Sequence, residues 1–339
     1  MTTKVAINGL GRIGRAFLKV AITNPDIKIV AANDLGDLEN LAYLLRYDSA
    51  YGKSGLDVKT DNGSLVVNGQ SIKFIQEKDP AKLPWAELGV DVVVESTGFF
   101  ESYDKAKLHI DAGARKVVVS APIKGEPVPG ITGGTVLMGI NDEMLATCQI
   151  SSNASCTTNS ASPLIKILHD TIGIDKAVLN TIHAYTASQK LVDSPDAGDF
   201  RRGRAAAQNI VPSTTGAAIA VTKVIPELAG KFDGIALRVP VITGSLVDVT
   251  FIAKRNTTVE EVNEILKEGA ANPRWSKVFA VTEEPLVSSD IIGESHASLA
   301  DLAFTKVVGG NLVKVLAWYD NEMGYTHTLV DHVIKTGGV

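Results

Sequence analysis

The sequence predicts two domains, an α/β domain built on a doubly wound sheet and a following α+β domain built on a mixed or antiparallel sheet. Three observations predict this organisation. The chain has 339 residues, which is long for a single hydrophobic core. Apolar strands alternate with helical patterns over residues 1–150, as they do in parallel sheets. Over residues 151–320 the strand-like runs are longer and alternate between apolar and polar residues, as in a half-exposed sheet.

A glycine-rich turn near the start of the chain predicts a phosphate-binding site. It reads Gly9-Leu10-Gly11-Arg12-Ile13-Gly14 and lies between an apolar strand at residues 4–8 and a helical pattern. Glycines at this spacing let the backbone turn sharply and approach a pyrophosphate at the helix N-terminus. Such turns are common, but the strand before it and the helix after it favour a Rossmann-type dinucleotide-binding domain.

The residue that follows the second strand indicates which dinucleotide is bound. This strand, at residues 27–32, leads into Asn33 and Asp34. Asp34 lies about 20 residues beyond Gly14, where an acidic side chain accepts hydrogen bonds from a ribose 2′-hydroxyl and repels a 2′-phosphate. An aspartate that only caps a helix is the weaker alternative. We therefore expect NAD as the cofactor, with NADP as a poorer substitute.

The rest of the first domain repeats the alternation of strand and helix. We expect strands at residues 71–75, 90–95 and 116–120, and a helix at residues 103–112 that is closed by Gly113. The small residues Ser96, Thr97 and Ser120 stand where two of these strands end. Small side chains there leave room for a ligand that lies across the edge of the sheet.

The two domains meet near a polar stretch that holds a cysteine. Cys156 lies in the middle of residues 151–159, which are Ser-, Asn- and Thr-rich, and a helical pattern follows. Ser, Asn and Thr satisfy the free N–H groups of a helix start, so we expect Cys156 at a helix N-terminus. The partial positive charge there favours a thiolate, which is a nucleophile. A buried structural cysteine is the alternative that the residues alone leave open.

The second domain is expected to contain six strands, two helices and one long loop. The loop, at residues 184–209, includes an arginine cluster, and a loop of this length inside a compact domain is usually functional. A C-terminal helix within residues 321–339 is expected to pack back on the first domain. The strands are predicted at residues 177–183, 234–240, 245–253, 286–288, 299–308 and 312–319, and the helices at residues 215–224 and 259–271.

Composition excludes several classes of protein. The formal net charge is −5, which argues against a required nucleic-acid partner and against a membrane surface. No stretch approaches about 20 uninterrupted apolar residues, and the N-terminal residues lack the pattern of a signal peptide. The two cysteines form neither a disulfide framework nor a metal cluster, so we expect no metal and a cytoplasmic location.

Five motifs, in order along almost the whole chain, resemble those of phosphorylating glyceraldehyde-3-phosphate dehydrogenases. The resemblance implies an NAD-dependent aldehyde oxidoreductase of glycolysis or gluconeogenesis that converts glyceraldehyde 3-phosphate and inorganic phosphate to 1,3-bisphosphoglycerate. It also implies a homotetramer with the long loop at a subunit interface. The motifs are Ile7-Asn8-Gly9-Leu10-Gly11-Arg12-Ile13-Gly14-Arg15, Ser152-Asn153-Ala154-Ser155-Cys156-Thr157-Thr158-Asn159, Thr181-Ile182-His183-Ala184-Tyr185-Thr186, Leu237-Arg238-Val239-Pro240 and Trp318-Tyr319-Asp320-Asn321-Glu322-Met323-Gly324-Tyr325.

The resemblance assigns roles to individual residues. Cys156 is implied to be the nucleophile that forms a thiohemiacetal and then a thioester, and His183 the general base. His169, on the helix after Cys156, was the rival histidine, but helical geometry points it away from the helix start. The implied phosphate-binding residues are Ser155, Thr157, Thr186, Arg202, Thr215, Gly216 and Arg238. The implied cofactor-binding residues are Asn8, Gly9, Gly11, Arg12, Ile13, Gly14, Asp34, Lys78, Ser96, Thr97, Ser120, Asn321 and Tyr325.

The sequence departs from the family pattern at three positions and leaves two other functions open. Ser160 stands where a second cysteine is common, Ser188 replaces a frequent aspartate, and Ser194 occupies an often apolar position that could ease binding of a 2′-phosphate. One alternative is an erythrose-4-phosphate dehydrogenase, which would not need tight phosphate binding because water can attack its thioester. The other alternative is a non-catalytic binding protein on the same scaffold.

Overall fold

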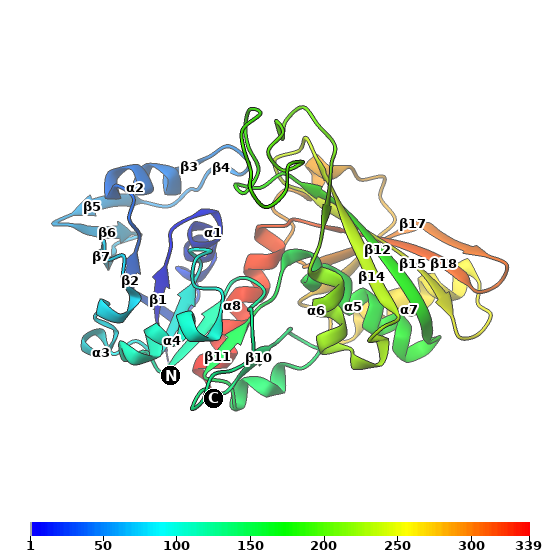
Figure 1. The fold of residues 1–339 in the computed structure, drawn as a ribbon, viewed down its shortest axis with the longest axis horizontal. Coiled ribbons are helices and arrows are strands. Elements are labelled where there is room, and N and C mark those ends of the chain that lie inside the picture. The colour runs from blue at the N-terminus through cyan, green and yellow to red at the C-terminus, as the bar shows by residue number, and fades with distance from the viewer. Residues whose placement is uncertain (1) are drawn as a thin grey trace. The chain divides into compact units, whose positions relative to one another are not determined.

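The computed structural model describes residues 2–339, which divide into two compact units. Unit 1 runs to Ala154 and includes the C-terminal segment Thr326–Val339, and unit 2 is Ser155–Tyr325. Each unit has its own sheet (Figure 1). No helix within residues 2–339 is long and apolar enough to cross a membrane. Within the same residues, no three histidine, cysteine, aspartate or glutamate side chains are grouped so as to hold a metal ion.

Unit 1 contains a nine-stranded sheet whose order is β10-β11-β9-β8-β1-β2-β7-β6-β5. Strand β1 is flanked by β2 on one side and β8 on the other, so the chain order reverses there, as in a doubly wound sheet. The parallel strands are β1 (Thr3–Asn8), β2 (Ile27–Asn33), β7 (Gln70–Ile75), β8 (Val92–Glu95), β9 (Lys116–Val119), β10 (Gly133–Thr135) and β11 (Ile150–Ser152), and the antiparallel edge is β6 (Ser64–Val67) and β5 (Val58–Asp61).

Helices of unit 1 bury one face each. Helix α1 (Arg12–Ala21) buries Phe17 and Leu18, and α2 (Leu38–Arg46) starts at Asp37, whose side chain accepts from Asn40 N. The C-terminal α8 (Met323–Gly337) contributes Thr326 onward to this unit. The remaining elements are α3 (Trp85–Leu88), α4 (Tyr103–Asp111), the 3₁₀ turns η1 (Pro80–Lys82) and η2 (Asp142–Ala146), and the hairpin β3 (Tyr47–Asp48) with β4 (Gly52–Lys53).

Unit 2 contains a seven-stranded mixed sheet with the order β13-β14-β12-β15-β18-β17-β16. Helix α5 (Cys156–Thr171) contacts both α6 (Ala217–Val224) and α7 (Val259–Ala271), and all three contact the sheet (Figure 1). Every second residue of β15 is buried, as the alternating sequence predicts. The strands are β12 (Ile174–Ala184), β13 (Val211–Thr214), β14 (Phe232–Val239), β15 (Ser245–Ala253), β16 (Phe279–Thr282), β17 (Ser298–Val308) and β18 (Leu312–Tyr319), with 3₁₀ turns η3 (Pro226–Leu228) and η4 (Ser288–Ile291).

The predicted fold class is confirmed, but one predicted strand is wrong. Residues 286–288 form no strand, because a 3₁₀ turn begins at Ser288 and the Asp290 side chain accepts from Val287 N. The strand of this region is β16, which pairs in parallel with β17. Strands β5 and β6 are not predicted from the sequence, since each is only four residues long. A tight turn with positive φ at Asn62 and Gly63 joins them.

His332 joins α8 to the sheet of unit 1 through buried hydrogen bonds. Its Nδ1 lies 3.1 Å from Asn153 Oδ1, and its Nε2 lies 2.7 Å from Ser151 Oγ. An amide oxygen only accepts, so Nδ1 carries the proton and Nε2 accepts from the serine hydroxyl. Asn153 Nδ2 in turn donates to Thr328 Oγ1. A neutral imidazole therefore holds α8 against β11.

We expect His332 to make the protein less stable in acid. Burial lowers the pKa of His332 to about 3, whereas a histidine in an unfolded chain has a pKa of about 6.5. Between these values only the unfolded chain binds the proton, so stability falls as the pH drops below about 6.5, by about 1.4 kcal/mol per pH unit. His332→Asn, which keeps a donor toward Asn153, should reduce this dependence. Free energies of unfolding in urea, measured from neutral to acid pH, test the prediction.

His296→Asn is the matched control. The hydrogen bond that His296 Nδ1 donates to Glu294 Oε1 raises the pKa of His296. This histidine therefore stabilises the native state below its unfolded pKa, and the contribution is lost as pH rises through the folded pKa. Its removal should therefore lower stability but leave the slope between about pH 6.5 and 4.5 unchanged, whereas His332→Asn reduces that slope. An unchanged pH dependence in His332→Asn would contradict the prediction.

Candidate active site

Cys156 is the first residue of α5, as the sequence predicts. Ser155 caps the helix, with its Oγ accepting from Thr158 N at 3.1 Å. The preceding Ala154 has a left-handed backbone, with a φ of 56°, and this bend leads the chain from β11 into the helix. The local sequence therefore places the sulfur at the end of the helix where N–H groups are not used by the helix itself.

His183 lies beside Cys156 in unit 2. It is the penultimate residue of β12, and its Nε2 is 3.3 Å from Cys156 Sγ. Arg238 occupies the position in register with His183 on the neighbouring parallel strand β14. Residues in register on adjacent strands point to the same face of a sheet, so the pairing of these strands brings the guanidinium to the imidazole.

The hydrogen bonds at Nδ1 of His183 determine whether Nε2, which faces the sulfur, can accept a proton. Nδ1 lies 2.6 Å from Ala184 O and 2.6 Å from Arg238 Nη1. A carbonyl only accepts and a guanidinium only donates, so Nδ1 serves one of the two partners at a time. When Nδ1 donates to Ala184 O, Nε2 is left as an acceptor for the Cys156 proton. Arg238 Nη1 also donates to Ala184 O, at 3.2 Å, and so has a partner in either arrangement.

Burial opposes charge on both members of the pair. It raises the pKa of the Cys156 thiol, against smaller lowering effects of the Arg238 charge and the Thr157 amide. Burial, followed by the Arg238 charge, lowers the pKa of His183 to about 3. Burial therefore acts against the thiolate that the helix start favours, and the ionised form of Cys156 stays a prediction. A thiolate forms together with an imidazolium, as the proton crosses between two atoms 3.3 Å apart and the new charges attract each other.

Tyr319 supports this pair, although the sequence analysis assigned it no role. Its hydroxyl lies 2.9 Å from Thr157 Oγ1 and 2.8 Å from Thr181 Oγ1, and its ring meets that of His183 edge-on. It therefore ties the first turn of α5 to β12. The signal was present in the alternation of β18, which buries every second residue and ends with Tyr319 buried.

His169 has a structural role, as its position on the helix suggested. It lies in the last turn of α5, and its Nδ1 accepts from Ile174 N at 3.1 Å. The hydrogen bond joins the end of the helix to the start of β12. The rival histidine is thereby engaged at the opposite end of α5 from Cys156.

The predicted phosphate-binding residues fall into two groups. Ser155, Thr157 and Arg238 belong to the cluster around Cys156, but the Thr157 hydroxyl is buried and engaged by Tyr319. The others come from different segments of unit 2. Thr186 follows β12 and bonds Ser188 Oγ at 3.0 Å, Thr215 accepts from Ala217 N, Gly216 is the N-cap of α6, and Arg202 belongs to the long loop.

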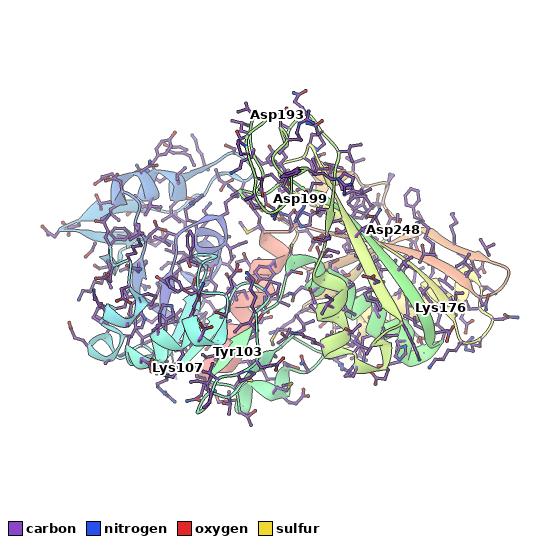
Figure 2. The ribbon with its side chains drawn as sticks, in the orientation of Figure 1. Tyr103, Lys107, Lys176, Asp193, Asp199 and Asp248 are labelled. Carbon is purple, nitrogen blue, oxygen red and sulfur yellow. The ribbon has the colours of Figure 1, made fainter. Side chains whose placement is uncertain are left out.

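Carboxylates surround Arg202 in the long loop. Its guanidinium lies 3.7 Å from Asp196 and 4.0 Å from Asp199, and Arg204 pairs with Asp193 at 2.9 Å. Figure 2 shows Asp193 and Asp199 in this loop. Within residues 2–339, no ion pair or hydrogen bond joins Arg202 to the Cys156 cluster. Arg202 and Arg204 are therefore held largely by acidic residues of their own loop.

The glycine turn of unit 1 has the geometry that close approach of a pyrophosphate needs. Gly9 has a φ of 98°, and a Cβ at Gly14 would lie 1.9 Å from Gly9 O. A Cβ at Gly11 would meet nothing within 4 Å, so the backbone there is open. Gly11 is also the N-cap of α1 and provides no capping side chain. The residues present therefore fit a dinucleotide phosphate at the start of α1; Arg12 and Ile13 form the first turn of this helix.

Asp34 directly follows β2 and is joined to the glycine turn. Its Oδ2 accepts from Leu10 N at 2.6 Å, and its Oδ1 accepts from Gly36 N at 2.7 Å. The two amides fix the carboxylate, and each oxygen keeps a further lone pair for a ribose hydroxyl. Leu35 beside it is exposed. This arrangement fits NAD, because a fixed carboxylate repels a 2′-phosphate.

The other predicted cofactor residues of unit 1 stand at or near the same edge of the sheet. Ser96 Oγ donates to Gly9 O, Thr97 Oγ1 donates to Glu95, and Ser120 N donates to Glu95 O. The Asn8 side chain is buried and bonded to other side chains, so it is not free to contact a ligand directly. Lys78 is exposed.

Asn321 and Tyr325 are the predicted cofactor residues of unit 2. The Asn321 Oδ1 accepts from Ser245 Oγ at 2.9 Å and from Thr243 Oγ1 at 3.2 Å. Two hydroxyls hold the amide oxygen, which leaves the Nδ2 hydrogens as donors for a ligand. Tyr325 is buried in α8.

Comparisons with known proteins give one consistent result. The family profile described as "Glyceraldehyde 3-phosphate dehydrogenase, NAD binding domain" matches residues 3–103, and the profile for the C-terminal domain matches residues 155–321. The chain is similar to the glyceraldehyde-3-phosphate dehydrogenase of Clostridium pasteurianum, at 49% identity over 97% of this chain and 96% of the relative. It is 47% identical to glyceraldehyde-3-phosphate dehydrogenase 1 of Bacillus subtilis, over 99% of this chain and 100% of the relative.

We expect His183→Asn to slow alkylation of Cys156. The variant removes the acceptor for the thiol proton, so at neutral pH the rate with iodoacetamide should fall about tenfold or more, and the rates should converge in alkali where the thiol ionises without help. His169→Asn is the matched control and should alkylate like the parent. Cys148 is buried, and Cys156→Ser gives its background rate. Equal rates in parent and His183→Asn would contradict the assignment of the base.

Proposed function

This chain belongs to the glyceraldehyde-3-phosphate dehydrogenase family, and from that premise we propose how its own side chains perform the reaction. The chain catalyses the phosphorylating oxidation of glyceraldehyde 3-phosphate with NAD. The observation that carries the proposal is the contact of 3.3 Å between Cys156 Sγ and His183 Nε2 at the start of α5.

Cys156 is the nucleophile of this mechanism. Its sulfur attacks the aldehyde carbon and forms a C–S bond while the thiol proton passes to His183 Nε2. The imidazolium then gives this proton to the former carbonyl oxygen, which completes the thiohemiacetal and leaves His183 neutral. The contact of 3.3 Å between the two atoms suits this step, because the proton crosses directly and burial disfavours either charge without the other. The Arg238 charge favours the thiolate and thus assists the attack.

His183 is also the base of the oxidation. It takes the hydroxyl proton of the thiohemiacetal as the carbon loses a hydride, and the product is a thioester on Cys156. NAD, when bound, supplies the hydride acceptor. Gly9, Gly11, Gly14 and Asp34 would hold its phosphates and ribose. The donors of Asn321 Nδ2 would suit the carboxamide of its nicotinamide.

Inorganic phosphate ends the cycle by attacking the thioester carbon, with the Cys156 thiolate as the leaving group. Arg238 is proposed to bind the C3 phosphate of the substrate, and its guanidinium provides more donors than its two present acceptors use. Ser155, Thr215 and Gly216 are proposed to bind inorganic phosphate, Gly216 through the start of α6. Arg202 is the weakest of these proposals, because acidic side chains of the loop already compete for it.

We also propose, from family membership, that the chain forms a homotetramer and is located in the cytoplasm. The long loop and the segment after it carry large apolar side chains on the surface of the single chain, with Leu191 81%, Phe200 87% and Ile210 68% exposed. Apolar surface of this kind is typical of an interface. We expect sedimentation to give four times the mass of the chain, and Phe200→Asp with Leu191→Asp to lower it. A monomeric parent would contradict the tetramer and leave the reaction proposal untouched.

We expect initial rates to separate this activity from its alternatives. With glyceraldehyde 3-phosphate, NADH should form continuously only with inorganic phosphate present, because phosphate releases the thioester. NAD should give a kcat/KM at least tenfold above that of NADP, because Asp34 repels a 2′-phosphate. Cys156→Ser should abolish the activity and leave NAD affinity within a few-fold.

Each of the other functions has its own outcome. Equal turnover with and without phosphate, or a preference for erythrose 4-phosphate, would favour the erythrose-4-phosphate enzyme. No burst of NADH with excess enzyme would favour a binding protein. Comparable kcat/KM values for the two cofactors would show that Asp34 does not decide the choice.

A further inference from the structure

Three adjacent strands of unit 1 end in polar side chains that are fully buried. Asn33, Asn8 and Glu95 are the last residues of β2, β1 and β8, and they stand in register across the sheet. Asn33 Nδ2 donates to Asn8 Oδ1 at 2.7 Å, and Asn8 Nδ2 donates to Glu95 Oε2 at 2.6 Å. Their exposed fractions are 4%, 1% and 1%. A continuous row of side-chain hydrogen bonds therefore crosses the carboxyl ends of the strands.

His109 and Trp85 close the row on one side. The Trp85 indole N–H can only donate, and it lies 3.0 Å from His109 Nδ1. Nδ1 is therefore the acceptor, Nε2 carries the proton, and Nε2 donates to Glu95 Oε2 at 3.0 Å. Both rings are completely buried. We call Asn33, Asn8, Glu95, His109 and Trp85 the edge network.

The edge network is anchored to the backbone at both ends. The second oxygen of Glu95 accepts from Thr97 N at 2.8 Å and from Thr97 Oγ1 at 2.5 Å. At the other end, Asn33 Oδ1 accepts from Glu77 N, and Asn33 Nδ2 donates to Glu77 O. Each carboxylate oxygen of Glu95 thus receives two donors, and residues of β2, β1, β8, α4 and α3 are tied to one row.

The residues that follow each strand are the ones expected to hold the dinucleotide. Gly9 follows Asn8, Asp34 follows Asn33, and Ser96 with Thr97 follows Glu95. Backbone bonds connect the same points, from Gly9 N to Asn33 O and from Ser96 N to Asn8 O, both at 2.8 Å. Burying a carboxylate, two amides and an imidazole is costly unless every group is paired, and apolar residues could have filled the same space. Packing alone therefore does not account for the network.

We propose that Glu95, Asn33 and His109 are positioning residues for the bound dinucleotide. They set the spacing between the glycine turn, Asp34 and Thr97, and they act through Asn8 and Thr97 rather than by touching the ligand. The inference rests on the proposed role of this edge in binding NAD. The network lies wholly in unit 1, whereas Cys156 and His183 lie in unit 2, so its loss weakens NAD binding and leaves thiol chemistry intact.

The test is the NAD affinity of Glu95→Gln, measured by calorimetry. The amide of glutamine turns an NH₂ group toward two donors, which breaks one end of the row without changing its size. We expect the Kd and the KM for NAD to rise about tenfold or more, and kcat at saturating NAD to stay within about threefold of the parent. Alkylation of Cys156 without NAD should keep the parent rate.

Matched variants separate positioning from general stability. Gln70→Ala is the control, because it removes a side-chain bond from β7 to Ile29 O on β2, away from the carboxyl edge, and it should leave the Kd within twofold. His109→Leu should raise the Kd, and His109→Gln should restore most of the affinity, since glutamine can accept from Trp85 and donate to Glu95. Asn33→Ala breaks the row at its other end and decides the matter if Glu95→Gln does not fold.

The outcomes that overturn the inference differ from those that overturn the function. A folded Glu95→Gln or Asn33→Ala with a Kd for NAD within twofold of the parent would refute the positioning role. So would a rise in Gln70→Ala as large as in Glu95→Gln, since the effect would then be general loosening of the sheet. A parent that binds NAD but does not oxidise glyceraldehyde 3-phosphate would refute the proposed function and leave the positioning role standing.

Discussion

The chemistry of this chain depends on keeping the half-buried sulfur of Cys156 and the buried imidazole nitrogen of His183 3.3 Å apart. Neither group gains from being charged alone in such a place, because burial raises the pKa of Cys156 and lowers that of His183. The Cys156 thiol and the His183 imidazole therefore lie at the distance at which a proton can pass from sulfur to nitrogen. The helix cap at Ser155, the register of β12 with β14 and the hydroxyl of Tyr319 all serve to hold this distance.

The dinucleotide edge of unit 1 is organised by a different constraint. The backbone ladder stops at the carboxyl ends of the parallel strands. A ligand site there needs several loops held at a fixed spacing. Buried hydrogen bonds from Asn33 through Asn8 to Glu95 meet this need with groups that are directional, which apolar packing is not. Asp34 has two roles of this kind. Its carboxylate accepts hydrogen bonds from Leu10 N in the glycine turn and from Gly36 N, and it can still accept a hydrogen bond from a ribose hydroxyl.

The errors of the sequence analysis have physical causes. The thiolate expected at Cys156 depends on the helix start, which is a local feature, whereas burial by distant segments acts on its pKa in the opposite direction. Residues 286–288 have the composition of a strand, yet they lead into a 3₁₀ turn and pair with no strand of residues 2–339, whereas the short β16 pairs with β17. His109, Glu95 and Trp85 stood in the sequence as unremarked residues, because their relation exists only once the sheet is assembled.

The sequence by itself determined the fold class, the glycine turn, the helix that begins at Cys156 and, through motifs spread over the whole chain, the family. Turns, helix caps and hydrophobic periodicity depend on residues that are near neighbours in the chain. The family motifs are recognised from the order of residues alone. Only the tertiary structure decided that Arg238 meets His183, that Tyr319 links Thr157 to Thr181, and that acidic residues of the loop hold Arg202. Strand register and burial decide such contacts, and both arise from residues far apart in the chain.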